Sequence, residues 1–267
     1  MVLKPASGSG QVQSRIESAV ATVTLDHPGR MNAITVDMWG ELAEIFARLS
    51  SDPDLRCVVV RGAGGHFAAG ADIREFPRVR ADRDRVMAYH RQIIAPALQA
   101  IGDCVPPVIA AIEGVCVGGG LEIASRCDLR LAARGARFGA PINRLGFPMA
   151  PDEMRGLLEL AGRATTLEIL LEGRVFEADE ALAKGLLTRV VANEALESEL
   201  TATVARLCAG APRAARLNKW TARRLMGNPM PLSDTEWQAC FAYADGPDHP
   251  QGIQAFLKGT DPVFTGE

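Results

Sequence analysis

The chain is poor in aromatic residues and has no long uninterrupted hydrophobic run. Only 5% of its 267 residues are aromatic although 48% are hydrophobic, so the core must be built mainly from aliphatic side chains. The apolar segment from Val105 to Val117 is broken by two prolines, Glu113 and Gly114, and cannot span a bilayer as a helix. The first residues show no apolar stretch before a small-residue cleavage site, so we expect no secretory signal.

An excess of one charge and paired cysteines are also missing. The net charge is -3 and the pI is about 5.9, which predicts no basic surface for nucleic acid or an anionic membrane. The six cysteines include no C-x-x-C pair, and they are expected to be buried thiols in a reducing cytoplasm. No histidines have metal-ligand spacing, so no metal site is predicted. We therefore expect a cytoplasmic protein without nucleic-acid or membrane partners.

Glycine-rich turns are present, but none has the sequence of a phosphate-binding loop. Neither G-x-x-x-x-G-K-[ST] nor G-x-G-x-x-G between a strand and a helix occurs, which disfavours nucleotide phosphotransferases and dinucleotide enzymes. Three adjacent glycines, 118–120, come just before Glu122. Because such a run costs conformational entropy, it suggests that a ligand or another chain segment approaches this backbone closely. The simpler alternative is a helix whose first turn carries Glu122 to complement the helix dipole.

Strands and helices alternate over the first two-thirds of the chain. Apolar, β-branched runs predict strands at 19–25, 56–61, 107–112 and 128–132. Thr35 is a plausible N-cap for a helix that continues to about Ser50. A second long helix is expected between residues 81 and 101. This alternation predicts an α/β fold.

Beyond Pro151 the pattern becomes helical, and only 187–191 still has the pattern of a strand. We divide the chain into a flexible tail at 1–15, an α/β core at 16–195 and a helical region at 196–267. The last region is a candidate for subunit contact, because its apolar faces cannot all be buried on one another. The helices expected in this part of the chain are 151–161, 163–171, 178–184, 194–209, 212–226 and 233–243.

Two of the glycine-rich turns can serve one pocket. The stretches AAGAD (68–72) and VGGGLE (117–122) place small residues where a strand passes into a helix. Each can therefore direct a backbone N–H group into a shared space. Two such donors form an oxyanion hole, in which the loss of one donor costs about 2.7–4 kcal/mol of transition-state stabilisation. This pattern predicts a bound carbonyl oxygen.

Six segments, in order from about residue 19 to 260, resemble the signature stretches of the crotonase, or enoyl-CoA hydratase/isomerase, superfamily. The resemblance implies a spiral of ββα units with a helical C-terminal trimerisation region, assembled as a homotrimer or homohexamer. It also implies an acyl-CoA thioester substrate, a stabilised enolate and no cofactor beyond the substrate's own coenzyme A. The segments are LDHPGRMNAIT (25–35), HFAAGADIRE (66–75), GVCVGGGLEIASRCDLRLA (114–132), ARFGAPINRLG (136–146), GRVFEADEALAKGLLTRVV (173–191) and GIQAFLKG (252–259).

The resemblance assigns roles to individual residues. It places the oxyanion hole at the N–H groups of Ala71 and Gly119 and the first catalytic glutamate at Glu122. Ala69 is expected near the adenine, and the turn at Arg30 and Met31 beside the CoA phosphates. Further expected contacts with substrate or CoA are Asp72, Ile73, Arg74, Ile142, Phe256 and Lys258, and Asp72 has a helix cap as its alternative role.

One position departs from the family's pattern. The second glutamate of the hydratases is expected at residue 142, which is isoleucine and cannot transfer a proton. Asp152 or Glu153 could supply the missing acid, although acids at a helix start are common for dipole reasons and we favour a structural role for both. An enoyl-CoA hydratase-like enzyme is the first hypothesis. Acyl-CoA decarboxylation, thioester hydrolysis, isomerisation and non-catalytic acyl-CoA binding stay open.

Overall fold

The structure is a computed structural model, and it describes residues 10–227 and 230–266. Its centre is a six-stranded sheet in which β1 runs antiparallel to β2 and every later neighbour is parallel. β3 and β4 are almost continuously apolar because helices cover both faces of this sheet. In spatial order the strands are β1 (Gln11–Glu17), β2 (Val20–Asp26), β3 (Cys57–Gly62), β4 (Val108–Ile112), β6 (Leu129–Ala133) and β9 (Arg189–Val191).

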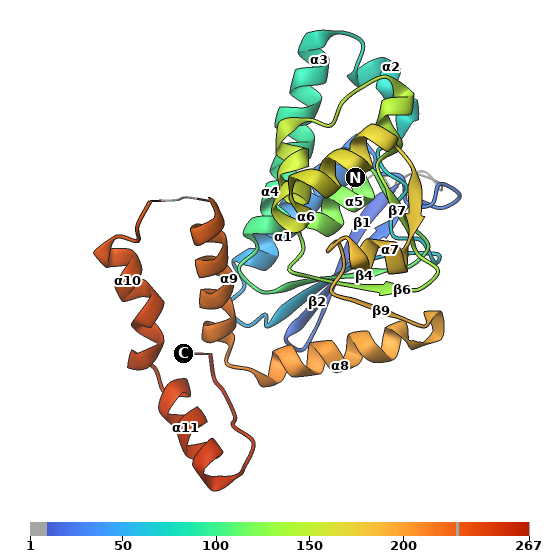
Figure 1. Ribbon diagram of the computed structural model, residues 1–267. Helices are drawn as coiled ribbons and strands as arrows, with labels where there is room; N and C mark the ends of the chain where they lie inside the picture. Colours follow the sequence, from blue (N-terminus) through green and yellow to red (C-terminus); the bar gives the residue numbers. More distant parts are fainter. Residues whose placement is uncertain (1–9, 228–229, 267) are drawn as a thin grey trace, which may run out of the picture.

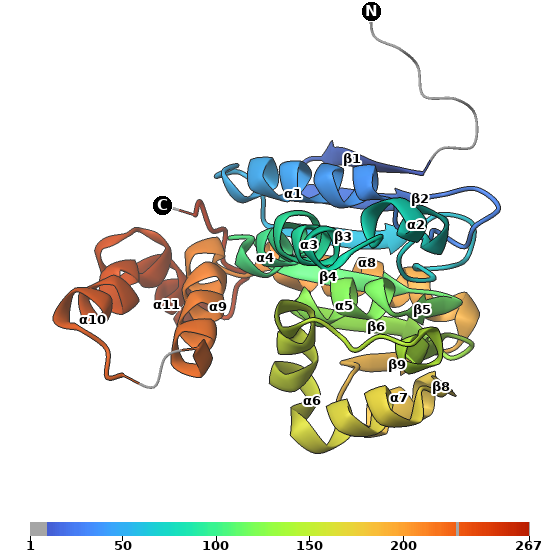
Figure 2. The same cartoon turned by 90° about the horizontal axis from the view of Figure 1, so that it is seen from above.

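Helices lie on both faces of the sheet. On one face are α1 (Val36–Ser50), α4 (Ala95–Asp103) and α5 (Gly119–Arg126), and α8 (Leu196–Ala209) runs along the other (Figures 1 and 2). α1 begins as predicted, because the Thr35 side chain accepts a hydrogen bond from the Met38 N–H. Leu196 and Leu200 of α8 pack in a separate apolar cluster on the second face. The predicted domain boundary at 195/196 stays a prediction, although the helix just after it covers the sheet.

A smaller sheet was not predicted. It joins β5 (Val115–Val117), β7 (Arg137–Gly139) and β8 (Val175–Glu177), whose three-residue strands are too short to show a period. The adjoining α6 (Pro151–Glu172) is interrupted at Gly162, where φ is 72° and ψ is 175°. This break lies where the sequence predicted the gap between two helices. Three short helices lie elsewhere along the core: α2 (Phe76–Val79) and α3 (Arg83–Ala88) between β3 and β4, and α7 (Ala178–Ala183) after β8.

The last helices stand beside the core. Figures 1 and 2 show α9 (Pro212–Gly227), α10 (Asp234–Phe241) and α11 (Asp248–Lys258) to one side of the sheet. α9 is fastened to the core by basic side chains: Arg216 donates to the Leu55 carbonyl, and Lys219 Nζ lies 2.6 Å from Asp128 Oδ2. Large apolar side chains on α10 and α11 are exposed in the single chain. Assembly into a trimer or hexamer stays a prediction.

Two expectations need correction. Residues 11–15 are not a flexible tail, because they belong to β1 and pair with β2, and residues 1–9 lie outside the described part. The helix predicted at 81–101 is not uniform. It consists of α3, a π-helical turn at Tyr89–Ile94 and α4. Within the described ranges, no helix has the length and apolar character needed to cross a bilayer.

Candidate active site

The two glycine-rich turns meet as the sequence predicts. Ala71 forms a parallel bridge with Ile34, in which the Gly70 carbonyl accepts from Ile34 N and Asp72 N donates to the Ile34 carbonyl. In that pattern the Ala71 N–H points away from Ile34. A Cβ added at Gly119 would lie 3.5 Å from Ala71 N, so the two backbones are in contact. Both residues line one cavity, which also contains Glu122.

The glycine run begins a helix. Gly118 has φ 49° and ψ −120°, a conformation that L side chains rarely adopt, and α5 starts at the next residue. As the first residue of α5, Gly119 has an N–H group without an acceptor in its own helix. The Ala71 N–H group directed away from Ile34 and the Gly119 N–H group at the helix start are the two donors predicted from the sequence, and their role as an oxyanion hole stays a prediction.

Gly120 allows the two turns to approach each other closely, because it has no Cβ. A Cβ at this position would lie 2.4 Å from the Ala68 carbonyl oxygen, so Gly120→Ala must push the two turns apart. We expect this substitution to lower the free energy of unfolding by about 1–3 kcal/mol, measured by urea denaturation. Gly40→Ala is the matched control, because that glycine lies in α1 with nothing near its added Cβ, and we expect it to stabilise by about 0.5–1 kcal/mol. Equal effects of the two substitutions would contradict this close contact.

A second acid faces the same cavity. Glu122 in α5 and Glu153 in the first turn of α6 are each only 5% exposed, and both line the cavity with Ile142. Asp152 lies beside them in sequence, but its side chain is 56% exposed and pairs with Arg155 at 3.7 Å. Glu153 is thus buried, unlike an ordinary acid at a helix start, and the structural role favoured for it stays a prediction. α6 places its carboxyl group in the cavity that contains Glu122.

His90 contacts the second acid. Its Nδ1 is hydrogen-bonded to Glu153 Oε1, and the His90 side chain is almost buried. The π-helical turn at Tyr89–Ile94 carries this histidine, and such turns are frequent at functional sites. This contact does not define which ring nitrogen of His90 carries the proton. Nδ1 can donate to an ionised Glu153 or accept from a protonated one.

Burial determines the protonation of Glu122. Desolvation raises the pKa of this carboxyl well above its ordinary value of 4.5, the charge of Glu153 raises it further, and Arg80 opposes the shift. Two neighbouring acids cannot both ionise easily in a buried site. The arrangement therefore favours a proton on Glu122.

The raised pKa makes the stability of the fold pH-dependent. Between pH 4.5 and the higher pKa of the folded state, Glu122 is protonated in the folded protein but ionised in the unfolded chain. The free energy of unfolding therefore falls as the pH rises through this window, because the buried carboxyl is held away from its ionised form. We expect Glu122→Gln to increase the free energy of unfolding by about 1–2 kcal/mol at pH 8, with little change at pH 4. Thermal denaturation across this range measures the difference. Glu44→Gln, on the exposed side of α1, is the control and should change stability by less than about 0.5 kcal/mol at either pH.

The cavity also contains an arginine among aromatic rings. The Arg80 guanidinium carbon lies 4.0 Å from the centroid of the Phe76 ring and 4.3 Å from that of the Phe147 ring. Neither Arg80 nor His90 was predicted. No local pattern identifies them, because the Arg80 side chain reaches the cavity and His90 reaches Glu153 only in the folded chain.

The turn expected at the CoA phosphates lies beside the AAGAD turn at 68–72. Met31 has φ 47°, and its carbonyl accepts from Ala69 N at 2.9 Å. The Asn32 side chain holds this turn by donating to the carbonyls of Ala63 and His66, a role that was not predicted. Arg30 belongs to the same turn. The structure thus brings Arg30, Met31 and Ala69 together, and their contact with CoA stays a prediction.

Asp72 has the alternative role considered for it. Its carboxylate accepts from Arg74 N at 3.1 Å and caps the 3₁₀ helix at Ile73–Glu75. It also pairs with the Arg74 side chain, whose hydrogen bond lowers the pKa of Asp72. Ile73 lines the cavity with Glu122, whereas Asp72 and Arg74 are not among its lining residues. Ala69, Ala71, Gly119 and Ile142 do line it.

Comparison with known proteins gives the family. The family model described as enoyl-CoA hydratase/isomerase matches residues 15–267. The chain belongs to this family. The (E)-benzylidenesuccinyl-CoA hydratase of Thauera aromatica is 32% identical over 96% of this chain and 99% of its own length. A short-chain-enoyl-CoA hydratase of Clostridium acetobutylicum is 30% identical over 91% and 92% of the two chains.

Solved structures agree with this assignment to the crotonase superfamily. The crystal structure of an enoyl-CoA hydratase/carnithine racemase from Magnetospirillum magneticum matches with a TM-score of 0.93 and 46% identity. That match covers 96% of each chain. The mixed α/β core with its helical C-terminal region is therefore a crotonase fold.

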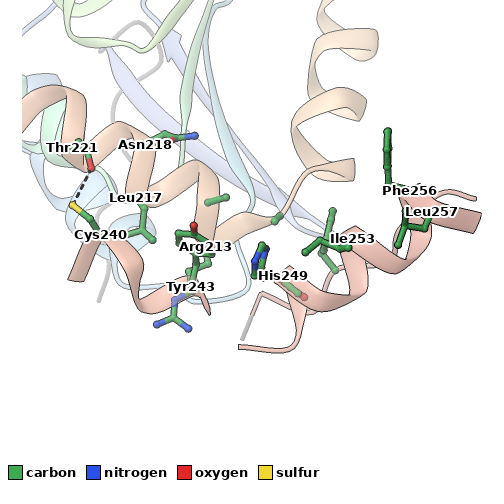
Figure 3. Close-up of a pocket in the computed structure, with 15 residues that line it drawn as sticks. Arg213, Leu217, Asn218, Thr221, Cys240, Tyr243, His249, Ile253, Phe256 and Leu257 are labelled. Carbon is green, nitrogen blue, oxygen red and sulfur yellow. Dashed lines mark hydrogen bonds between the residues drawn. The ribbon is translucent and has the colours of Figure 1, made fainter. Parts of the chain in front are cut away.

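The remaining two predicted residues lie far from the acids in this crotonase chain. Phe256 and Lys258 are on α11, and neither lines the cavity around Glu122. Phe256 is 85% exposed and instead borders a separate, mostly apolar groove of about 520 Å³ between α9, α10 and α11 (Figure 3). Their role at CoA stays a prediction.

Proposed function

We propose that this protein hydrates 2-enoyl-CoA thioesters. The observation that carries the proposal is the position of Glu153, which faces Glu122 in a cavity whose usual second acid position is Ile142. Hydration across a double bond needs one group to accept a proton from water and another to protonate carbon. The names of the hydratases similar to this chain support the same reaction.

The proposed mechanism assigns one task to each group. The N–H groups of Ala71 and Gly119 bind the thioester oxygen, which becomes negative when water attacks the β carbon. Glu153, in contact with His90, accepts the proton that the attacking water loses. Glu122, whose raised pKa favours its protonated form, donates a proton to the α carbon as the enolate collapses. One C–O bond and one C–H bond form, and proton exchange between the site and solvent restores both carboxyls.

Other reactions need fewer groups. Decarboxylation needs a single proton donor beside the oxyanion hole, isomerisation needs one group that removes a proton from one carbon and returns it to another, and a non-catalytic acyl-CoA-binding protein needs neither acid. Burying an ionisable group costs free energy. These functions give no reason for a second buried carboxyl in the cavity. Hydration therefore accounts best for the pair Glu122 and Glu153.

Isotope labelling tests the reaction. The purified protein is incubated with crotonyl-CoA in H₂¹⁸O, and separately in D₂O, and the products are examined by mass spectrometry and NMR. We expect one ¹⁸O at the β carbon and one deuteron at the α carbon. Free coenzyme A with ¹⁸O in the released acid would instead show thioester hydrolysis. An unchanged substrate together with measurable CoA binding would overturn hydration of this thioester and support a binding role.

A further inference from the structure

Arg80 is a charged group without a charged contact. Its side chain lines the cavity, where Phe76, Phe147 and Tyr89 surround the guanidinium with ring centroids 4.0, 4.3 and 5.1 Å from its central carbon. Among residues 10–227 and 230–266, no carboxylate oxygen forms an ion pair with it within 4.0 Å, and its Nε is buried without a hydrogen-bond partner. Glu122 and Glu153 attract it only from farther away.

Such an arginine is costly unless something pairs with it. Arg80 is half-buried, and desolvation lowers its pKa, so an opposite charge and further hydrogen bonds would stabilise it; its guanidinium offers a planar fork that matches a carboxylate. The aromatic rings stabilise the cation through their faces, and the Tyr89 hydroxyl accepts a hydrogen bond from the guanidinium, but the Arg80 Nε–H group still has no partner. Arg80 therefore places a positive charge at the cavity wall, with an Nε–H group that has no partner among the described residues.

The shape of the cavity restricts its occupant. Its volume is about 100 Å³, several times the roughly 10–15 Å³ that one water molecule needs by the same measure, so only a short acyl group would fit. Ile73, Ile142 and Leu145 give it an apolar wall, while Arg80 and the two acids are the charged groups among its lining residues. An acyl group with an apolar body and one anionic end complements this lining.

We propose that Arg80 binds a carboxylate of the acyl group, so that the preferred substrates are CoA monothioesters of short unsaturated dicarboxylic acids. The proposal rests on acyl-CoA binding at the site described above. The simplest alternative is that Arg80 only balances the charge of Glu122 and Glu153. In that case the affinity for a neutral acyl group would equal or exceed the affinity for an acidic one.

The test compares two saturated thioesters that cannot be hydrated. Glutaryl-CoA and pentanoyl-CoA have the same chain length and differ in whether the chain ends in a carboxylate or a methyl group. Isothermal titration calorimetry of the wild-type protein should show at least tenfold tighter binding of glutaryl-CoA. Arg80→Met should abolish this preference, and Arg80→Lys, which keeps the charge but loses the planar fork, should reduce it. Arg78→Met is the matched control, because Arg78 is exposed and pairs with Glu75, and it should keep the wild-type preference.

Equal or tighter binding of pentanoyl-CoA by the wild-type protein would overturn the proposal, whatever the variants do. A preference for glutaryl-CoA that survives in a folded Arg80→Met protein would also overturn it. Both results would leave the proposed hydration intact, since CoA binding is still seen. Failure to bind either thioester would instead reject the acyl-CoA site itself.

Discussion

Glu122→Gln is expected to lower kcat for crotonyl-CoA hydration by about 10²–10⁴-fold, the usual contribution of a general acid or base. Glutamine keeps the size and hydrogen-bonding capacity of the side chain but cannot give a proton to the α carbon. Because the oxyanion donors Ala71 and Gly119 are backbone groups, the affinity for a saturated thioester such as butyryl-CoA should change by less than about fivefold. Initial rates and calorimetric binding measure the two effects separately.

Glu44→Gln on α1 is the control for the loss of one carboxylate, and it should keep wild-type rates. A folded Glu122→Gln protein that retains more than a tenth of the wild-type kcat would refute a proton-transfer role for Glu122. A parallel collapse of butyryl-CoA affinity would show that the residue shapes the binding site instead.

Glu153→Gln is expected to cause a loss of similar size, although the family pattern has its second acid elsewhere in the sequence. Its neighbour supplies a stringent control. Asp152→Asn removes a carboxylate one residue away in the same helical turn, but that side chain is exposed and should not alter kcat more than about twofold. Because the two acids act in one reaction, combining Glu122→Gln with Glu153→Gln should add little to either single loss.

The pH profile of Glu153→Gln tests the electrostatic effect of Glu153 on Glu122, while kcat tests whether Glu153 takes part in catalysis. The charge of Glu153 raises the pKa of Glu122, so its removal should lower that pKa. As Glu122 must be protonated to act as the acid, the residual activity of Glu153→Gln should fall off at a lower pH than in the wild type. An unchanged kcat in this variant would leave hydration without its second group and contradict the mechanism.

The sequence predicted that the two glycine-rich turns meet, whereas their role as an oxyanion hole stays a prediction. Ala71 and Gly119 lie in local turns whose small residues and flanking strands are visible in the chain, and the structure brings them together. The parallel core strands were equally visible, because burial on both faces leaves a continuous apolar run such as 57–60.

The side-chain chemistry depended on distant packing. Glu153 has the local signature of an ordinary helix start, and its burial arises only from the way α6 lies over α5. Arg80 reaches the cavity and His90 reaches Glu153 from a part of the chain in which the sequence predicted only a helix between residues 81 and 101. The strand at 11–17 was missed because most of its residues are half-buried or exposed on an edge, so their polar composition suggested a tail.

The π-helical turn at Tyr89–Ile94 suggests a simple origin for the contact between His90 and Glu153. A π-helical turn contains one more residue than the α-helical turn it replaces, and each residue of an α-helix rotates the following side chains by about 100°. A single inserted codon in an ordinary helix can therefore turn one histidine toward a neighbouring helix while a compact fold is retained. Read in the opposite direction, the deletion of one residue here would swing His90 away from Glu153. In this region, the gain or loss of function can thus depend on chain length as much as on residue identity.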